Sequence, residues 1–412
     1  MHTRQRPYRL FEAHGIELEY MVVDRDTLDV RPLVAQLFTD VVGSPVADVP
    51  RGTMEWSNEL TDHVVEVRNA KPARRIAPLR KRFAAEVKAL DKALAKHNAM
   101  LLPGGAHPWM DPKRETVLWA HEHSDVYRTF DRLFGCQTHG WANTQSTHLN
   151  LSFAGDPEFT RLHAAVRLLL PIIPAIAASS PILDGRPTGF LDARMEAYLH
   201  AQERMPEMMG SLIPEAVFNE EEYYREIYSP IAQVLARHDA VVQLQHEFAN
   251  TRGAVARFDR GSVEIRVIDA QECPAADLAI AEFITVVLKA LASGRWVSTY
   301  LQRAWPESDL LAIFLQVIKD AGTTMIANRD YLLMFGLMKE ERMSAAKLWQ
   351  HLFVELYEEL SEDARQHIGS ILEHGCLASR ILKHTGRSPS REKLRTVYRE
   401  LGSCLLEDRL FL

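Results

Sequence analysis

The sequence predicts an α+β protein built around a mainly antiparallel sheet, and two observations support this class. Short segments with alternating apolar and polar residues are interleaved with amphipathic helical patterns up to about residue 270, whereas almost everything after residue 275 has helical spacing. Many connections between the strands are too short or too irregular for regular βαβ units, which favours antiparallel pairing. We expect residues 1–300 to form the main domain and residues 301–412 to form a helical extension packed on it.

Each element follows from its local pattern. Alternation of apolar and polar residues predicts strands at 15–24, 53–60, 63–68, 100–102, 145–153, 240–245, 254–258 and 262–268. Helical periodicity predicts helices at 33–42, 73–98, 126–134, 159–178, 191–202, 220–237, 275–292, 309–321, 345–360 and 362–373. Pro78 indicates that the regular part of the helix at 73–98 begins near that residue.

Composition excludes several classes of protein. The net charge is −7 and no block of Lys and Arg is present, so a nucleic-acid partner is not expected. The most apolar run, 168–183, contains three prolines and is short for a membrane span, and the first ten residues lack the apolar core of a signal peptide. The sequence therefore predicts a soluble cytoplasmic protein, in agreement with four scattered cysteines, Cys136, Cys273, Cys376 and Cys404.

The strand predicted at 15–24 carries two carboxylates, Glu17 and Glu19, two positions apart. Strand side chains alternate between faces, so both carboxylates project from the same side. Two like charges side by side are unfavourable unless something positive lies between them, and a hard divalent cation is the usual solution. The alternative is an ordinary solvent-facing strand edge, where Glu is common.

Three later segments repeat this design. Glu59 precedes the strand that carries Glu66 and Arg68 on one face, although a carboxylate with Arg two residues on can be a simple surface ion pair. His148 lies on the polar face of the strand 145–153, where a histidine is often only hydrogen-bonded. In the strand 262–268, Val263-Glu264-Ile265-Arg266 repeats the pattern Val65-Glu66-Val67-Arg68.

Taken together, the four segments predict a sheet with one charged face. Carboxylates with one imidazole suit Mg²⁺ or Mn²⁺ rather than zinc or copper. Arginines beside such a cluster suit a transferring phosphoryl group, whose oxygens need positive partners. The chain has neither GxxxxGK[ST] nor a GxGxxG after a strand, so the pattern predicts ATP-dependent phosphoryl chemistry on a sheet without a P-loop.

Four motifs, in this order, resemble the glutamate–cysteine ligase type 2 family. They are Gly15-Ile16-Glu17-Leu18-Glu19-Tyr20, Gly104-Gly105-Ala106-His107-Pro108, Ser146-Thr147-His148-Leu149-Asn150 and Gly261-Ser262-Val263-Glu264-Ile265-Arg266-Val267-Ile268-Asp269. The resemblance covers roughly residues 8 to 295. It implies a curved, mainly antiparallel sheet of the glutamine synthetase-like type, with ATP and divalent metals on the charged face and a carboxylate–amine ligase activity in residues 1–300.

Carried over by motif, the resemblance implies a role for each candidate residue. Arg266 and Arg194 would stabilise the transferred phosphate, and Arg257, Arg260 and Arg68 would contact the nucleotide or substrate. The metal ligands would be Glu17, Glu19, Glu59, Glu66, His148 and Glu264. Segments 136–145 and 205–228 depart from the family pattern and are candidate places for the amine pocket.

The resemblance implies amide formation driven by ATP and Mg²⁺ (or Mn²⁺). A carboxylate, expected to be the γ-carboxylate of glutamate, would be phosphorylated by ATP, and an amine such as cysteine would displace phosphate from the acyl phosphate. A guanidino or carboxylate kinase on the same sheet and a non-catalytic ATP-binding protein are the alternatives. The expected partners are small-molecule substrates, an amino acid carboxylate and an amine, and further copies of the chain in a homodimer or higher homo-oligomer. The helices at the C-terminal end are expected to finish the core or to build the oligomer interface, and the apolar Leu410-Phe411-Leu412 indicates a tail that docks.

Overall fold

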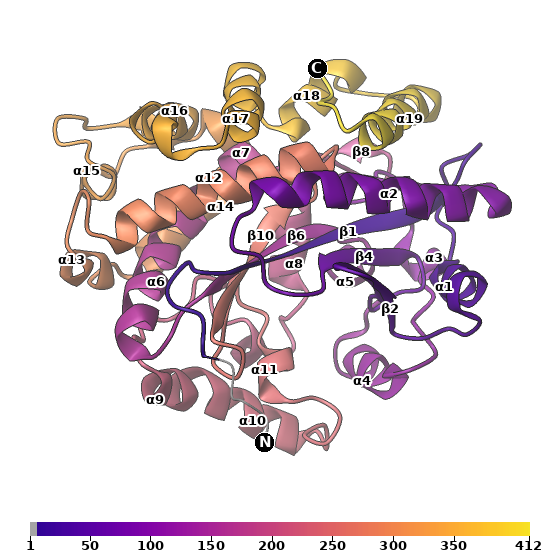
Figure 1. Ribbon diagram of the computed structural model, residues 1–412, viewed down its shortest axis with the longest axis horizontal. Helices are drawn as coiled ribbons and strands as arrows, with labels where there is room; N and C mark the ends of the chain where they lie inside the picture. Colours follow the sequence, from indigo (N-terminus) through magenta and orange to yellow (C-terminus); the bar gives the residue numbers. More distant parts are fainter. Residues whose placement is uncertain (1–5) are drawn as a thin grey trace.

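The computed structural model describes residues 6–412 and contains one large sheet (Figure 1). Its strand order is β2-β3-β4-β1-β6-β10-β9, β5 pairs with β1, and every pairing between these strands is antiparallel. The strands are β1 (His14–Asp24), β2 (Asp48–Arg51), β3 (Met54–Asn58), β4 (Val64–Asn69), β5 (Ala99–Leu102), β6 (Ser146–Ser152), β9 (Ala254–Arg257) and β10 (Ser262–Asp269). The predicted α+β class with a mainly antiparallel sheet is confirmed.

Helices α2 (Arg80–Leu94) and α12 (Pro274–Ala292) cover one face of the sheet, as Figure 1 shows. That face is apolar because alternate residues in the middle of β1, Ile16, Leu18, Tyr20 and Val22, are fully buried there. The same core takes the apolar stripe of α2 and the largely buried α12. The strong alternation in β1 therefore sends its carboxylates to the opposite face.

The opposite face is bordered by helices from the middle of the chain. Tyr127 of α4 (Ser124–Phe134) accepts a hydrogen bond from Asn58 at the end of β3, and Arg194 of α8 (Ala193–His200) pairs with Asp269 at the end of β10. Also in this part of the chain are α5 (His139–Ala142), α9 (Glu220–Tyr223), α10 (Ser229–Arg237) and α11 (His246–Ala249). Of these, α11 approaches the charged side at Arg257, which donates to the carbonyl oxygen of Glu247.

A bulge in β10 changes which residues face this charged side. Glu264 lies opposite Asn150 and Asp269 lies opposite Ser146, so five steps along β10 match four steps along β6. Directly opposite residues share a face, and one extra residue reverses the alternation of side chains. Asp269 therefore shares the charged face with Glu264, although their sequence spacing would place them on opposite faces of a regular strand.

The remaining elements surround this centre. They are α1 (Val34–Val42), α3 (Pro112–Glu115), α6 (Asp156–Leu169), α7 (Pro174–Ala177), α13 (Thr299–Arg303), α14 (Glu307–Asp320), α15 (Arg329–Leu333), α16 (Ala345–Glu355), α17 (Glu362–His374), α18 (Leu377–Thr385) and α19 (Arg391–Glu407), with the small pairs β7 (Ile182–Leu183) with β8 (Arg186–Pro187) and β11 (Met325–Ile326) with β12 (Met343–Ser344). In the C-terminal part, α17 packs on α12 and α19 on β5.

Two predicted elements differ from the structure. The strand expected at 240–245 is wrong, because this segment forms a turn that leads into α11, and its apolar Val242 is 91% exposed. The helix expected at 159–178 is divided into α6, a 3₁₀ turn (Leu170–Ile172) and α7. Pro171 and Pro174 lack the backbone donors that a continuous helix needs, which explains the division.

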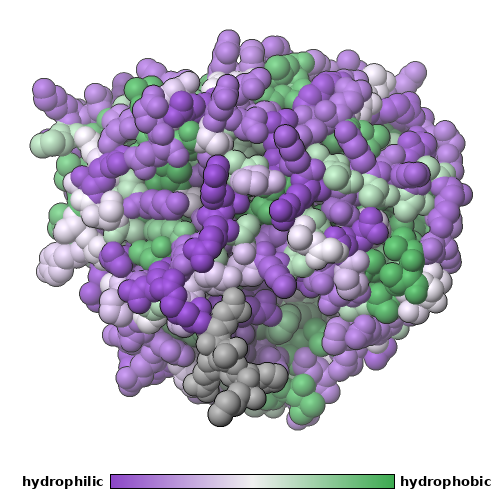
Figure 2. Space-filling model, in the orientation of Figure 1, coloured by the Kyte–Doolittle hydropathy of each residue, from purple (hydrophilic) through white to green (hydrophobic). Residues whose placement is uncertain are grey.

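The surface facing the viewer in Figure 2 is largely hydrophilic, with small separate hydrophobic patches. Among residues 6–412, no helix has both the length and the apolar character required to cross a bilayer.

Candidate active site

The charged face carries a cluster of carboxylates contributed by neighbouring strands. Glu17 of β1 lies opposite His148 of β6, and Glu19 lies opposite Glu66 of β4. One ligand atom from each of Glu17, Glu66 and His148 lies within 4.8 Å of the others, and the same holds for Glu19, Glu59 and Glu66. The structure thus brings together five of the six predicted metal ligands.

Burial and mutual repulsion disfavour the ionised form of this cluster. Glu59, in the turn between β3 and β4, has its pKa raised to about 7 by burial and by the nearby charge of Glu19. Burial and the charge of Glu17 raise the pKa of Glu66 well above its usual range. A carboxylate that loses its solvation next to other carboxylates holds its proton unless a cation replaces it.

His148 supplies some of the missing positive charge. Its Nδ1 lies 3.0 Å from Glu17 Oε2, and its Nε2 lies 3.8 Å from Glu19 Oε1. Burial alone would lower the pKa of His148, but the hydrogen bond to Glu17 and the charges of both carboxylates raise it above its ordinary value. The imidazole therefore favours its protonated form here, as expected for a ring held between two acids.

Hydrogen bonds from β6 fix the orientation of the two β1 carboxylates. Ser146 donates to Glu19 Oε2 from its backbone N–H at 2.7 Å and from its hydroxyl at 2.9 Å. Asn150 donates to Glu17 Oε1 at 3.1 Å. Each carboxylate still has lone pairs directed at the cluster, so the arrangement holds the acids in place and leaves them able to bind a cation.

Glu264 lies beside this cluster on β10 and is held between two arginines. Arg257 Nε lies 3.3 Å from one carboxylate oxygen, and Arg266 Nε bonds the other. Burial opposes its ionisation, but the charges of Arg266 and Arg257 keep the pKa of Glu264 far below its usual range. In residues 6–412, Glu264 does not join either group of metal-ligand atoms, and its assignment as a ligand stays a prediction.

Arg194 is almost fully buried at the end of β10. Its Nε bonds Asp269, and its terminal nitrogens lie 3.4 Å from the backbone carbonyl of Arg266. Asp269 also accepts from the backbone N–H of Ser179 at 2.8 Å and the hydroxyl of Ser180 at 2.8 Å. Arg194 therefore connects α8 to the strand that carries Arg266.

The other two predicted arginines lie in different surroundings. Arg68 pairs with Glu55 at 2.6 Å, with Asp48 at 2.8 Å and with Glu66 at 3.2 Å, so it neutralises acids at one side of the cluster. Arg260 lies in the turn between β9 and β10, where it is largely exposed and 3.6 Å from the neighbouring Asp259. The nucleotide contacts predicted for both residues stay predictions.

Sequence reasoning did not identify three residues next to these groups. Asn58 donates to Tyr127 at 2.9 Å, and the charge of Glu59, after burial, raises the pKa of that phenol. Tyr198 of α8 lies near Arg266 and donates to the carbonyl of Thr251 at 2.9 Å. Tyr127 and Tyr198 come from helices whose sequence carries no strand alternation, and only the fold brings them to the sheet.

The donor set fits hard divalent cations. It consists of carboxylate oxygens with one imidazole nitrogen, which is the ligand chemistry of Mg²⁺ or Mn²⁺ and lacks the thiolates of a structural zinc site. Two groups of atoms share Glu66, and burial together with the neighbouring carboxylates raises the pKa of both Glu59 and Glu66. A divalent cation between these atoms would offset the repulsion among the carboxylates and favour their ionised forms.

Comparison with known proteins shows the family of the chain. A family model described as glutamate-cysteine ligase family 2 matches residues 13–400. An uncharacterized protein from Archaeoglobus fulgidus is 29% identical over 401 residues, which cover 97% of this chain and 100% of that protein. A putative glutamate–cysteine ligase 2 from Sorangium cellulosum is 28% identical over 192 residues, or 45% of this chain and 46% of that protein.

A solved structure shares the fold. The crystal structure of glutamate–cysteine ligase from Francisella tularensis in complex with AMP matches with a TM-score of 0.62 at 12% identity, and the match covers 97% of this chain and 90% of that chain. At this identity the match concerns the fold alone. The family match extends over nearly the whole chain, so this protein belongs to glutamate-cysteine ligase family 2 and is an ATP-dependent ligase that forms an amide bond.

Proposed function

We propose that this protein joins the γ-carboxylate of glutamate to an amine, either cysteine or another amino compound, with release of ADP and phosphate. The observation that carries the proposal is that the carboxylate cluster and Arg266 lie on the same face of one sheet. Arg266 lies close enough to the cluster for the charge of Glu17, after that of Glu264, to raise the pKa of Arg266. Cation-binding acids beside a guanidinium suit phosphoryl transfer from ATP to a carboxylate.

The proposed reaction has two steps. A carboxylate oxygen attacks the γ-phosphorus of ATP, and the bond between that phosphorus and the bridging oxygen breaks. ADP departs, and the carboxylate has become an acyl phosphate. The amine nitrogen then attacks the acyl carbon, loses a proton and displaces inorganic phosphate. Phosphoryl transfer of this kind depends chiefly on alignment and on stabilisation of charge.

The residues take distinct roles in this proposal. Glu17, Glu19, Glu59, Glu66 and His148 would hold Mg²⁺ or Mn²⁺, with Glu264 as a further predicted ligand. When bound, the cations would neutralise the phosphate oxygens and hold them in line. Their carboxylate ligands are already oriented by hydrogen bonds from β6, which supports a preorganised site.

Arg266 would contact the transferred phosphate. Its side chain is 23% exposed, so it retains an open side while Glu264 fixes the guanidinium from the other. Arg194 has its guanidinium engaged with Asp269 and with the Arg266 carbonyl, which supports a positioning role for β10 in addition to its predicted contact with the phosphate. Arg257 holds Glu264 in turn and would lie at the nucleotide or substrate.

The test is ADP release with ATP, Mg²⁺ and glutamate, with and without hydroxylamine. Hydroxylamine converts an acyl phosphate into a hydroxamate, so we expect ADP release and hydroxamate formation to depend on both Mg²⁺ and glutamate. A panel of amines, with cysteine first, would then identify the acceptor by amide formation. A stable phosphorylated product formed without any amine would instead establish a kinase, and ATP binding without ADP release across the panel would contradict the proposal.

A further inference from the structure

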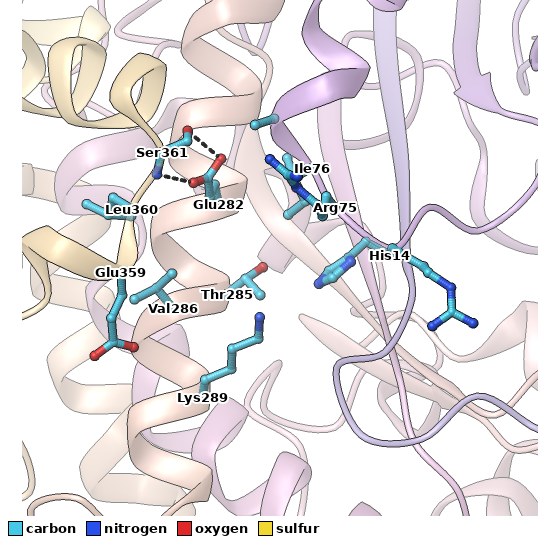
Figure 3. A pocket seen from close by; sticks show the side chains of 12 residues that line it. His14, Arg75, Ile76, Glu282, Thr285, Val286, Lys289, Glu359, Leu360 and Ser361 are labelled. Carbon is cyan, nitrogen blue, oxygen red and sulfur yellow. Dashed lines mark hydrogen bonds between the residues drawn. The ribbon is translucent and has the colours of Figure 1, made fainter.

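A cavity lies on the other side of the sheet from the carboxylate cluster. His14 begins β1 and shares the face of Ile16 and Leu18, which is opposite to the face of Glu17. The cavity occupies about 320 Å³ between β1, α12 and the start of α17, and Figure 3 shows the side chains that line it. This volume is within the range of small-molecule sites, about 300–1,000 Å³.

His14 gives this cavity a buried hydrogen-bonding group with no partner. The side chain is only 3% exposed, and its Nδ1 lies 3.0 Å from the carbonyl oxygen of Ala73. A carbonyl can only accept, so Nδ1 carries the proton, and the neutral ring presents Nε2 as an acceptor. No group in residues 6–412 hydrogen-bonds this Nε2, and a buried polar atom of this kind ordinarily has a partner.

Two cations of the cavity lack an acidic partner. Within the described chain, neither Lys289 of α12 nor Arg75 has a carboxylate within 4.0 Å. The Lys289 ammonium lies over the ring of Phe11 at 6.0 Å, which is a weak interaction for a charge at a partly exposed position. In Figure 3 the side chains of Lys289 and His14 extend toward one another across the cavity.

The acids of the cavity are already engaged. Glu282 accepts from the backbone N–H of Ser361 at 2.7 Å and from its hydroxyl at 3.0 Å, and these bonds hold the start of α17 against α12 (Figure 3). Glu359 pairs with Arg295 at 2.5 Å. The Ser361 donors are neutral, so Glu282 keeps its negative charge and acts on Lys289 through space. Lys289 and Arg75 carry two positive charges against this one negative charge, so the cavity retains an excess of one positive charge.

We propose that this cavity binds a small organic oxyanion that also carries a hydroxyl or ammonium group. The anionic group, a carboxylate or a phosphate, would lie at Lys289 and Arg75, and the donor group would complete the hydrogen bonding of His14 Nε2. The side chains of Ile76, Val286 and Leu360 form an apolar wall that suits a short carbon chain. The site is separate from the face proposed for catalysis and does not require the proposed reaction.

Isothermal titration calorimetry of the full chain with L-malate, succinate and inorganic phosphate tests this proposal. L-Malate has two carboxylates and a hydroxyl donor, whereas succinate has two carboxylates and no hydroxyl. L-Malate should therefore bind more tightly than succinate. Lys289→Met and Arg75→Gln should each weaken binding about tenfold or more, the loss expected for one charged hydrogen bond. Tighter binding of phosphate than of L-malate would assign the site to phosphate compounds within the proposed class.

Three variants separate this cavity from other places where an anion could bind. Lys88→Met is the control for Lys289→Met, because it also removes one lysine from a helix. Lys88 lies on the exposed side of α2, so this variant should leave the affinity unchanged. Arg266→Gln should also leave it unchanged, because that residue faces the other side of the sheet. Absence of binding at millimolar concentrations, equal binding of the diamine putrescine, or an affinity that responds to Arg266→Gln and not to Lys289→Met would overturn the proposal.

Discussion

Replacement of Glu59 by Gln should stabilise the protein when divalent metal is absent. The pKa of Glu59 is raised from 4.5 to about 7, chiefly by burial and then by Glu19. A raised carboxyl pKa means that ionisation favours the unfolded chain, so the destabilisation is absent below 4.5, grows as the pH rises toward 7 and is complete above that. At about 1.4 kcal/mol per pH unit, the shift corresponds to about 3 kcal/mol.

The assay is urea unfolding in EDTA at several pH values. Near pH 8, Glu59→Gln should raise the free energy of unfolding by up to about 3 kcal/mol relative to the unsubstituted protein, and the two proteins should converge near pH 4. With Mg²⁺ or Mn²⁺ the order should reverse, since the cation stabilises the protein that retains all its ligands. Equal pH dependence of both proteins in EDTA would refute the electrostatic account.

Glu55→Gln is the matched control on the same sheet face. Its carboxylate is compensated by Arg68 at 2.6 Å, so its removal leaves an arginine with one acid fewer. We expect Glu55→Gln to be neutral or mildly destabilising in EDTA, by about 0–1 kcal/mol. A gain in stability equal to that of Glu59→Gln would show that any carboxylate on this face produces the effect.

Three further predictions concern the arginine of β10, a buried histidine and a glycine. Arg266→Gln should lower turnover by about 10²–10³ with an unchanged circular dichroism spectrum, whereas Arg225→Gln, which removes a surface pair, should leave turnover unchanged, and steady-state kinetics would check both. Burial depresses the pKa of His107 from 6.5 to about 4. The stability that the neutral imidazole contributes is therefore complete above pH 6.5 and is lost as the pH falls toward 4. Between these two pH values, His107→Gln should reduce the proton uptake on unfolding by about one, measured from the pH dependence of urea midpoints. Gly105→Ala would place a Cβ 2.4 Å from the Asp269 carboxyl carbon and should cost about 1–3 kcal/mol of stability, measured by calorimetry.

The sequence was most informative where one strand face is buried. Alternation in β1 places Glu17 and Glu19 on one face because slipping by one residue would bury both carboxylates among apolar side chains. It could not reveal that Glu59 meets Glu66, since that contact depends on the turn between β3 and β4. Glu59 was a candidate because it precedes the strand that carries Glu66, and the resemblance to known ligases then implied a metal-binding role for both.

Other features were inaccessible for a physical reason. The apolar segment 240–245 has the composition of a strand, but no neighbouring strand offers it a partner, and it forms a turn instead. Asp269 was included in a motif without a role, because its face is set by the bulge in β10 and by donors that lie about 75 to 90 residues away in the sequence. Such long-range contacts leave no local periodic signal.

The bulge makes the length of β10 as important as its composition. Insertion of one residue near Val267 would move Asp269 one step further along β10 and turn its carboxylate into the apolar layer beneath α12, away from its serine and arginine donors. Point substitutions at 267 only change the packing of one side chain, whereas an insertion would separate Arg194 from the strand that it positions. Natural and designed variants of this protein should therefore accept changes of residue in this segment far more readily than an added residue.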